Sequence, residues 1–173
     1  MNRITLGTLH ICMILFFLIT SCQERRKEQA LISSKRVFDN INLLTDDQEK
    51  SLYTEIQALD KDIGSQIAIV IIDTLGSKDL NEVSLKTAEE LNLGRVKYND
   101  GLLIFLAFGD HKVRIEVARG LEKIIKDDIA SRIMNDVMAP EFRKQHYYEG
   151  LLAMVKEISK LIRDNKDLVG KYP

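Results

Sequence analysis

The hydrophobic and polar positions divide the chain into an apolar start, a polar stretch and a regularly patterned remainder. Apolar residues run without interruption from Ile11 to Ile19, and residues 23 to 36 show no period. From Val37 onward, apolar residues recur at helix or strand spacing. We therefore predict one folded domain over residues 37–165, preceded by a tether over 22–36 and followed by a tail over 166–173.

The first predicted helix covers Asp46–Asp62. Thr45 and Gln48 form a capping-box pattern at its start, and Gly64 follows its end. Its apolar positions are spaced for one buried face: Leu52, Ile56, Leu59 and Ile63. The run Gln66–Asp73 is continuously apolar and rich in β-branched residues, which is typical of a central strand covered on both faces.

The middle of the domain predicts a helix followed by a hairpin. Asp79 and Glu82 are placed to cap a helix that reaches about Leu93 and is ended by Gly94, with Leu80, Val83 and Leu91 facing inward. Gly101–Phe108 reads as a second buried strand. Lys112–Val117 alternates apolar and charged residues, so we expect an antiparallel partner strand with one face in water.

Two further helices are predicted near the end of the chain. One covers about Asp128–Met138, where Pro140 is expected to break the chain, and the last covers about Tyr147–Arg163. The order is then α-β-α-β-β-α-α. This order predicts an α/β fold: a three-layer sandwich whose mixed sheet combines a parallel β-α-β crossover with an antiparallel hairpin strand, with helices on both faces.

Composition narrows the possible functions. The 173 residues carry a formal net charge of -1, so no basic excess indicates nucleic-acid binding. Only two cysteines occur, Cys12 and Cys22. The predicted domain therefore has no thiol for a disulfide, a zinc–cysteine site or nucleophilic catalysis.

The N-terminus predicts export and lipid anchoring. Arg3 precedes an apolar run too short to span about 30 Å of hydrocarbon but typical of a signal peptide. The run ends at Leu18–Cys22 (LITSC), which resembles the lipobox of bacterial lipoproteins. The resemblance implies a signal peptide over 1–21, lipidation of Cys22, and a location in the bacterial cell envelope facing the periplasm or the exterior. The alternative is a plain transmembrane anchor with an incidental cysteine.

Several motifs in order resemble the TPM domain family, which is named after a thylakoid lumen protein, a photosystem II repair factor and a nematode receptor modulator. They are Val37–Asp39, Asn99–Leu103, Asp110–Val117, Gly120–Glu122, Asp127, Pro140–Arg143 and Tyr148–Leu151. The chain departs from the family pattern at Ala118-Arg119-Gly120, where a second glycine is usual. The resemblance implies a membrane-associated extracytoplasmic domain. Some members bind calcium or magnesium, and some plant relatives are described as acid phosphatases.

The first candidate site lies where the second buried strand begins and the hairpin strand ends. Asn99, Asp100, Glu122 and Asp127 are expected to meet there. Carboxylate and amide oxygens suit Ca²⁺ or Mg²⁺, and a cation would relieve the repulsion between neighbouring carboxylates. The alternative is structural: Asn-Asp-Gly is a common turn, Asp127 can cap a helix, and Glu122 can be solvated.

The second candidate group is Asp39, Asp73 and Asp110, expected at the carboxyl ends of the parallel strands, where ligands of open α/β sheets bind. The alternative is that Asp73 and Asp110 simply form turns. His111, in the hairpin turn, is expected to be solvated rather than catalytic.

Two functions remain open. One is a lipid-tethered binding module that holds a divalent cation and assists the assembly or maintenance of a membrane protein complex. The other is metal-assisted phosphomonoester hydrolysis, in which Arg95 and Arg119 neutralise the phosphate.

Overall fold

The computed structural model describes residues 35–172. The chain from Arg36 to Pro173 forms one compact unit with its own core, so this part is expected to fold independently. The predicted signal peptide, the lipidation site at Cys22 and nearly all of the predicted tether lie outside the described residues. Within residues 35–172, none of the helices has the length and apolar character needed to cross a membrane.

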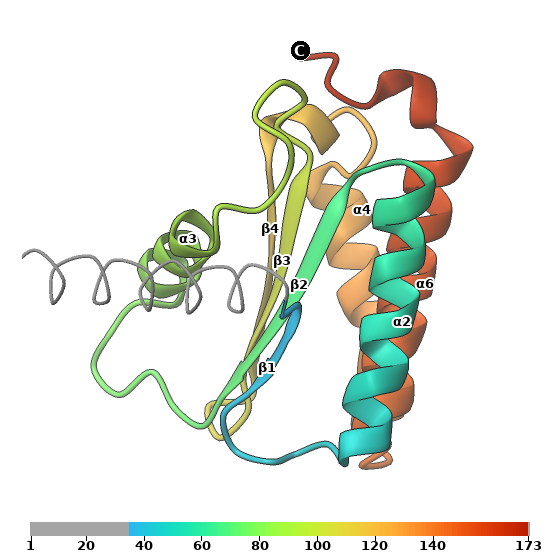
Figure 1. Cartoon of the computed structure of the whole chain (residues 1–173). Helices are drawn as coiled ribbons and strands as arrows, with labels where there is room; N and C mark the ends of the chain where they lie inside the picture. Colours follow the sequence, from blue (N-terminus) through green and yellow to red (C-terminus); the bar gives the residue numbers. More distant parts are fainter. Residues whose placement is uncertain (1–34, 173) are drawn as a thin grey trace, which may run out of the picture. The chain divides into compact units, whose positions relative to one another are not determined.

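One mixed sheet forms the centre of the domain. Its strands are β1 (Val37–Asp39), β2 (Gln66–Ile72), β3 (Gly101–Ala107) and β4 (Lys112–Val117), in the spatial order β1-β2-β3-β4 (Figure 1). The strands β1, β2 and β3 run parallel, whereas β3 and β4 form an antiparallel pair. The carboxyl edge of the parallel strands therefore carries the β3–β4 turn, and the amino edge carries the loop that enters β3.

Helices cover both faces of the sheet, as Figure 1 shows. One face carries α3 (Leu80–Leu91), and α2 (Asp46–Asp62) and α6 (Tyr147–Asp164) pack on the other. The remaining helical segments are η1 (Arg119–Leu121), α4 (Asp127–Arg132), η2 (Ile133–Met138), α5 (Ala139–Phe142) and η3 (Lys166–Leu168).

Alternation along the strands divides the core into two parts. Ile69 and Ile104 point into the larger cluster beneath α2 and α6, whereas Val70 and Phe105 point into the smaller cluster beneath α3. Both central strands are thus covered on both faces, which explains their continuous apolar sequences. Full burial of each such side chain contributes about 1.5–3 kcal/mol.

The predicted α/β fold is confirmed. The helix Asp46–Asp62 has the predicted bounds, and the side chains of Thr45 and Gln48 form the predicted capping box. The strand Lys112–Val117 also has the predicted bounds and pairs antiparallel with β3. The last predicted helix corresponds to α6, in which Leu151, Val155, Ile158 and Ile162 are completely buried.

Three details of the prediction were wrong. The strand β1 was not predicted, because three residues are too few to show a period. Pro140 does not break the chain: it lies at the start of α5, directly after the π-helical segment η2, and helical structure continues from Asp127 to Phe142. The helix α3 ends at Leu91 rather than beside Gly94, because Asn92 adopts the left-handed conformation there.

Candidate functional site

The first candidate site lies at the amino edge of the sheet, where the loop before β3 meets the turn after β4. We call the segments 95–100 and 118–127 together the rim. Asn99 has a φ of 47° and its carbonyl oxygen accepts a hydrogen bond from the Gly120 N–H at 2.8 Å. A Cβ at position 120 would overlap the Tyr98 carbonyl oxygen. Glycine at 120 therefore lets the two segments touch.

The C-terminal segment closes the rim from one side. The Gly170 N–H donates to the Gly120 carbonyl oxygen at 2.9 Å, and Gly170 packs against Tyr98. Part of the segment predicted as a tail is thus in contact with the domain.

Asp100 is completely buried, and its carboxylate stabilises the loop before β3. Its carboxylate accepts hydrogen bonds from the Arg95 backbone N–H at 2.8 Å, from the Arg95 guanidinium at 2.5 and 3.0 Å, and from the Ser65 hydroxyl at 3.2 Å. The Arg95 guanidinium also lies 4.0 Å from the centre of the Tyr98 ring. These contacts use the accepting directions of the Asp100 carboxylate, so it has little capacity left for a cation.

The other three predicted residues line two neighbouring surface depressions. Asn99 and Glu122 belong to one of about 490 Å³, which Arg119 also lines. Glu122 and Asp127 belong to the second, of about 470 Å³. Within residues 35–172 the Glu122 and Asp127 carboxylates form no hydrogen bond or ion pair, and both residues are exposed. The rim therefore offers two free carboxylates and one amide along two adjoining depressions, of which only Glu122 lines both.

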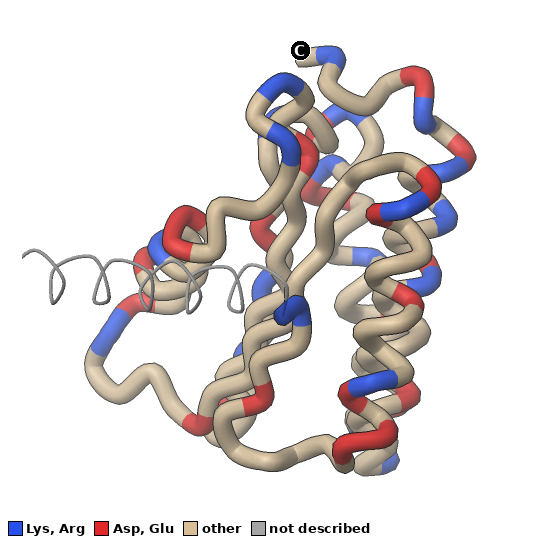
Figure 2. The backbone as a smooth tube through the Cα atoms, viewed as in Figure 1, with Lys and Arg blue, Asp and Glu red and all other residues tan. Residues whose placement is uncertain are grey.

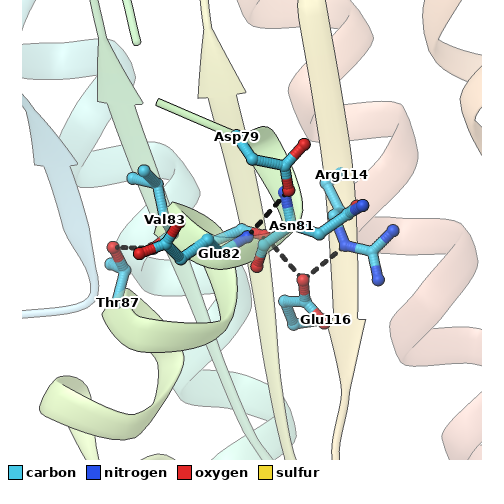
Figure 3. Close-up of polar contacts among 8 residues, drawn as sticks. Asp79, Asn81, Glu82, Val83, Thr87, Arg114 and Glu116 are labelled. Carbon is cyan, nitrogen blue, oxygen red and sulfur yellow. Dashed lines mark hydrogen bonds and ion pairs between the residues drawn. The ribbon is translucent and has the colours of Figure 1, made fainter. Parts of the chain in front are cut away.

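Glu116 is a polar residue of this surface that the sequence did not single out. It lines both depressions, and Figure 3 shows its carboxylate between Arg114 and the helix α3. It accepts a hydrogen bond from the buried Ser84 hydroxyl at 2.6 Å and forms an ion pair with Arg114. Its strand face was predicted to be in water, but α3 covers it. The only feature of the sequence that indicated this contact is Ser84, a polar residue among the apolar positions on the inner face of α3.

The donor set can be compared with what a hard cation needs. In the described part of the chain, no three His, Cys, Asp or Glu side chains are close enough together to hold a metal ion. Asp100 is engaged elsewhere, whereas Asn99, Glu122 and Asp127 keep free oxygens. Asn99 and Asp127 line different depressions and only Glu122 lines both, so these residues do not form a closed cation site made of protein oxygens.

The second predicted group lies at the opposite, carboxyl edge. Asp39 accepts from the Ile41 and Leu44 N–H groups at 3.1 and 2.7 Å. Asp110 accepts from the Leu75 N–H at 2.6 Å and the Thr74 hydroxyl at 3.0 Å. The Leu75 hydrogen bond is the main cause of the lowered pKa of Asp110.

Asp73 lies beside the same turn, where its backbone carbonyl accepts from the Gly109 N–H at 2.7 Å. The three residues share one edge of the sheet. The carboxylates of Asp39 and Asp110 accept hydrogen bonds within the turns that follow β1 and β2, so they stabilise those turns.

A comparison with known protein families identifies the family of this chain. A family model described as TPM domain matches residues 37–161. The chain belongs to the TPM domain family. The resemblance seen in the sequence is thereby confirmed, and the matched region contains all four strands and the rim.

Solved structures share the fold. The N-terminal domain of a P. gingivalis protein, solved by NMR, is similar at 31% identity and a TM-score of 0.72, over 80% of this chain and 88% of that one. The BA42 protein from Bizionia argentinensis has 19% identity and a TM-score of 0.62, with 75% and 91% covered.

A third structure with this fold is the N-terminal domain of the cg2496 protein from Corynebacterium glutamicum, at 11% identity and a TM-score of 0.59, with 73% and 78% covered. No curated protein matches this chain.

Proposed function

We propose that this chain is a lipid-anchored, extracytoplasmic TPM domain that acts as a binding module for a membrane protein complex and holds a divalent cation weakly at its rim. The observation that carries the cation is the pair of free carboxylates, Glu122 and Asp127, on one shared depression. The lipobox-like sequence ending at Cys22 carries the anchor.

The cation site is proposed to use Glu122, Asp127 and the Asn99 side chain, with water completing the coordination. Ca²⁺ tolerates such an irregular set better than Mg²⁺, which demands near-octahedral geometry. Because few ligands come from the protein, the dissociation constant is expected in the range of about 10⁻⁴–10⁻³ M. Such a site responds to extracytoplasmic rather than cytosolic calcium levels.

Calorimetric titration of residues 35–173 with CaCl₂ tests the cation. Glu122→Gln and Asp127→Asn are each expected to weaken binding about tenfold, because each removes a charged ligand, equivalent to about 1.4 kcal/mol. Asp128→Asn is the matched control, since Asp128 is also exposed in the first turn of α4 but does not line the depression. Equal binding by all four proteins would refute the site.

Membrane fractionation of the full chain tests the anchor. Cys22→Ala is expected to move the protein from the membrane to the soluble fraction, because lipid chains on Cys22 supply the membrane affinity. Cys12→Ala is the control, since Cys12 is the only other cysteine and precedes the predicted cleavage point. Membrane proteins that co-purify from detergent extract with wild type but not with Cys22→Ala would be the candidate partners.

A phosphatase activity is the second candidate, and Arg119 is the observation that favours it. This exposed arginine lines the same depression as Glu122 and Asn99, so a cation and a guanidinium could both contact a phosphate there. Arg95 is less suited, because its guanidinium is paired with Asp100. Release of phosphate from an aryl phosphate, with Ca²⁺ or Mg²⁺ from acid to neutral pH, and its loss in Arg119→Gln would support this candidate over the binding module.

A further inference from the structure

A separate cavity lies at the carboxyl edge of the sheet, away from the rim. It measures about 400 Å³ and lies between the β3–β4 turn and the segment that joins α5 to α6. Its apolar lining comprises Leu106, Phe108, Val113, Met138, Ala139, Phe142 and Tyr147, and its polar lining comprises His111, Lys112, Arg143 and Gln145. No Asp or Glu lines it. Both its size and its place beyond the end of a parallel strand are typical of ligand sites.

Three aromatic rings form the apolar part. Tyr147 stands edge-on to Phe108, with centroids 4.9 Å apart, and edge-on to Phe142, with centroids 5.4 Å apart. Edge-to-face stacking holds each ring in a defined orientation. The cavity therefore has a preformed apolar wall, because these rings need not reorganise when a ligand arrives.

The polar part is basic. The Lys112 and Arg143 side chains are exposed and form no hydrogen bond or ion pair within residues 35–172. The acids nearby are engaged: Glu141 contacts Lys144 at 2.8 Å and His146 at 3.0 Å. Asp110, whose pKa is lowered mainly by the Leu75 N–H and to a smaller extent by Lys112 and His111, is held by the backbone of the adjacent loop.

Two residues that line the cavity have an unusual backbone conformation. Five non-glycine residues of the described chain have positive φ: Asn42, Asn92, Asn99, His111 and Gln145. Asparagine and histidine are enriched at positive φ, whereas glutamine is not. His111 and Gln145, at φ values of 53° and 66°, both line the cavity. Residues held in this region cluster at ligand sites, where the side chain is retained despite its conformational cost.

We infer that this cavity binds an organic carboxylate with an apolar, preferably aromatic, body. The body packs against Phe108, Phe142 and Tyr147, and the carboxylate accepts charge-assisted hydrogen bonds from Lys112 and Arg143. The carboxylate can belong to a free small molecule or to the C-terminus of a polypeptide that ends in an apolar residue. The inference is independent of the cation site, since no residue is shared by the two.

The first experiment uses 3-phenylpropionate as the probe in an NMR titration of ¹⁵N-labelled residues 35–173. Saturable shifts are expected at the amides of Phe108, Val113 and Tyr147. The neutral 3-phenylpropanol is expected to bind about tenfold more weakly, because it lacks the charge that strengthens the hydrogen bonds. Acetate, which lacks the body, is expected to give no saturable shift. Equal binding of the alcohol and the acid, or no saturation by the acid, would overturn the inference.

Variants locate the binding. Lys112→Gln and Arg143→Gln are each expected to weaken 3-phenylpropionate binding at least about fivefold. Lys61→Gln makes the same change of charge on an exposed residue at the end of α2 and is expected to bind like wild type. Unchanged circular dichroism would show that each variant is folded. Binding retained in Lys112→Gln and in Arg143→Gln would overturn the inference.

A further experiment with peptides distinguishes a polypeptide C-terminus from a small carboxylate as the ligand. A hexapeptide ending in Phe with a free carboxylate is compared with its C-terminal amide and with N-acetylphenylalanine. Tighter binding of the free-acid peptide than of N-acetylphenylalanine would assign a polypeptide terminus as the ligand. Equal binding of these two would assign a small carboxylate. Equal binding of the free acid and the amide would contradict a carboxylate site of either kind.

Discussion

Both edges of the sheet carry acidic residues (Figure 2), but the two edges use them differently. At the carboxyl edge, the carboxylates of Asp39 and Asp110 accept hydrogen bonds from backbone N–H groups of the following loops. At the amino edge, Glu122 and Asp127 have no partner within the described residues. The Asp39 and Asp110 carboxylates therefore stabilise loops, whereas the Glu122 and Asp127 carboxylates remain available to a ligand.

The contrast recurs inside the rim. Asp100 and Glu122 belong to neighbouring loops, but Asp100 is buried in an ion pair with Arg95 and Glu122 is exposed. Residue type and spacing do not show which role a carboxylate has, because the same oxygen atoms can accept hydrogen bonds from a loop or bind a cation. What separates them is the supply of N–H donors around each side chain.

The largest effect is expected from Asp100→Asn. The change keeps the volume and removes the buried charge that pairs with Arg95, and removing one partner of such an ion pair is costly. We expect a loss of about 3 kcal/mol in the free energy of unfolding, at the lower end for such pairs because Arg95 is partly exposed. Urea denaturation measures it. Glu122→Gln, the control, should change stability by less than about 0.5 kcal/mol; equal losses would contradict the contrast between the two carboxylates.

A smaller effect is expected from Gly120→Ala. The added methyl group overlaps the Tyr98 carbonyl oxygen, so the loop before β3 must shift. Overpacking of this kind costs about 2 kcal/mol. Thermal unfolding of Gly120→Ala is compared with that of Gly76→Ala, where no atom lies within 4 Å of the added Cβ and only the cost of its positive φ remains. An equal loss in both variants would show that the two rim segments do not depend on their close approach.

Calcium should stabilise the domain through the rim. A ligand that binds only the folded state adds about 1.4 kcal/mol when its free concentration is ten times the dissociation constant. We expect this gain for wild type in millimolar CaCl₂, measured by urea denaturation at constant ionic strength. The double variant Glu122→Gln, Asp127→Asn should show no gain. The double variant Asp39→Asn, Asp110→Asn should retain it, and a loss there would move the cation to the other edge.

The smallest effect concerns pH and Asp110. The pKa of this carboxyl is lowered in the folded protein, chiefly by the Leu75 N–H. Its stabilising contribution is therefore present above the ordinary pKa of an aspartate and is lost as the pH falls through the lower, folded-state value. Asp110→Asn should be less stable than wild type at pH 7, and the difference should close below about pH 4. Denaturant titration across pH tests this, with Asp73→Asn as the control.

The sequence predicted most of the fold because its long elements carry a clear period. The capping residues Thr45 and Gln48 fixed the start of α2, and the alternation of Lys112–Val117 fixed β4. The prediction failed where the signal was short or ambiguous: β1 has three residues, and Pro140 is equally consistent with a break and with a first helical turn. The convergence of Asn99 with Glu122 on one surface could be predicted from the hairpin, because β3 begins where β4 ends.

By itself, the sequence determined the layered α/β architecture, the family and the residues available to a site, since burial patterns and local hydrogen bonding are encoded within each segment. Only the tertiary structure decided which acids remain free. The Ser65 hydroxyl donates to Asp100 from 35 positions away in the chain, and the Ser84 hydroxyl donates to Glu116 from a helix 32 positions away. Such partners come together through packing between elements, and no spacing along a single segment records them.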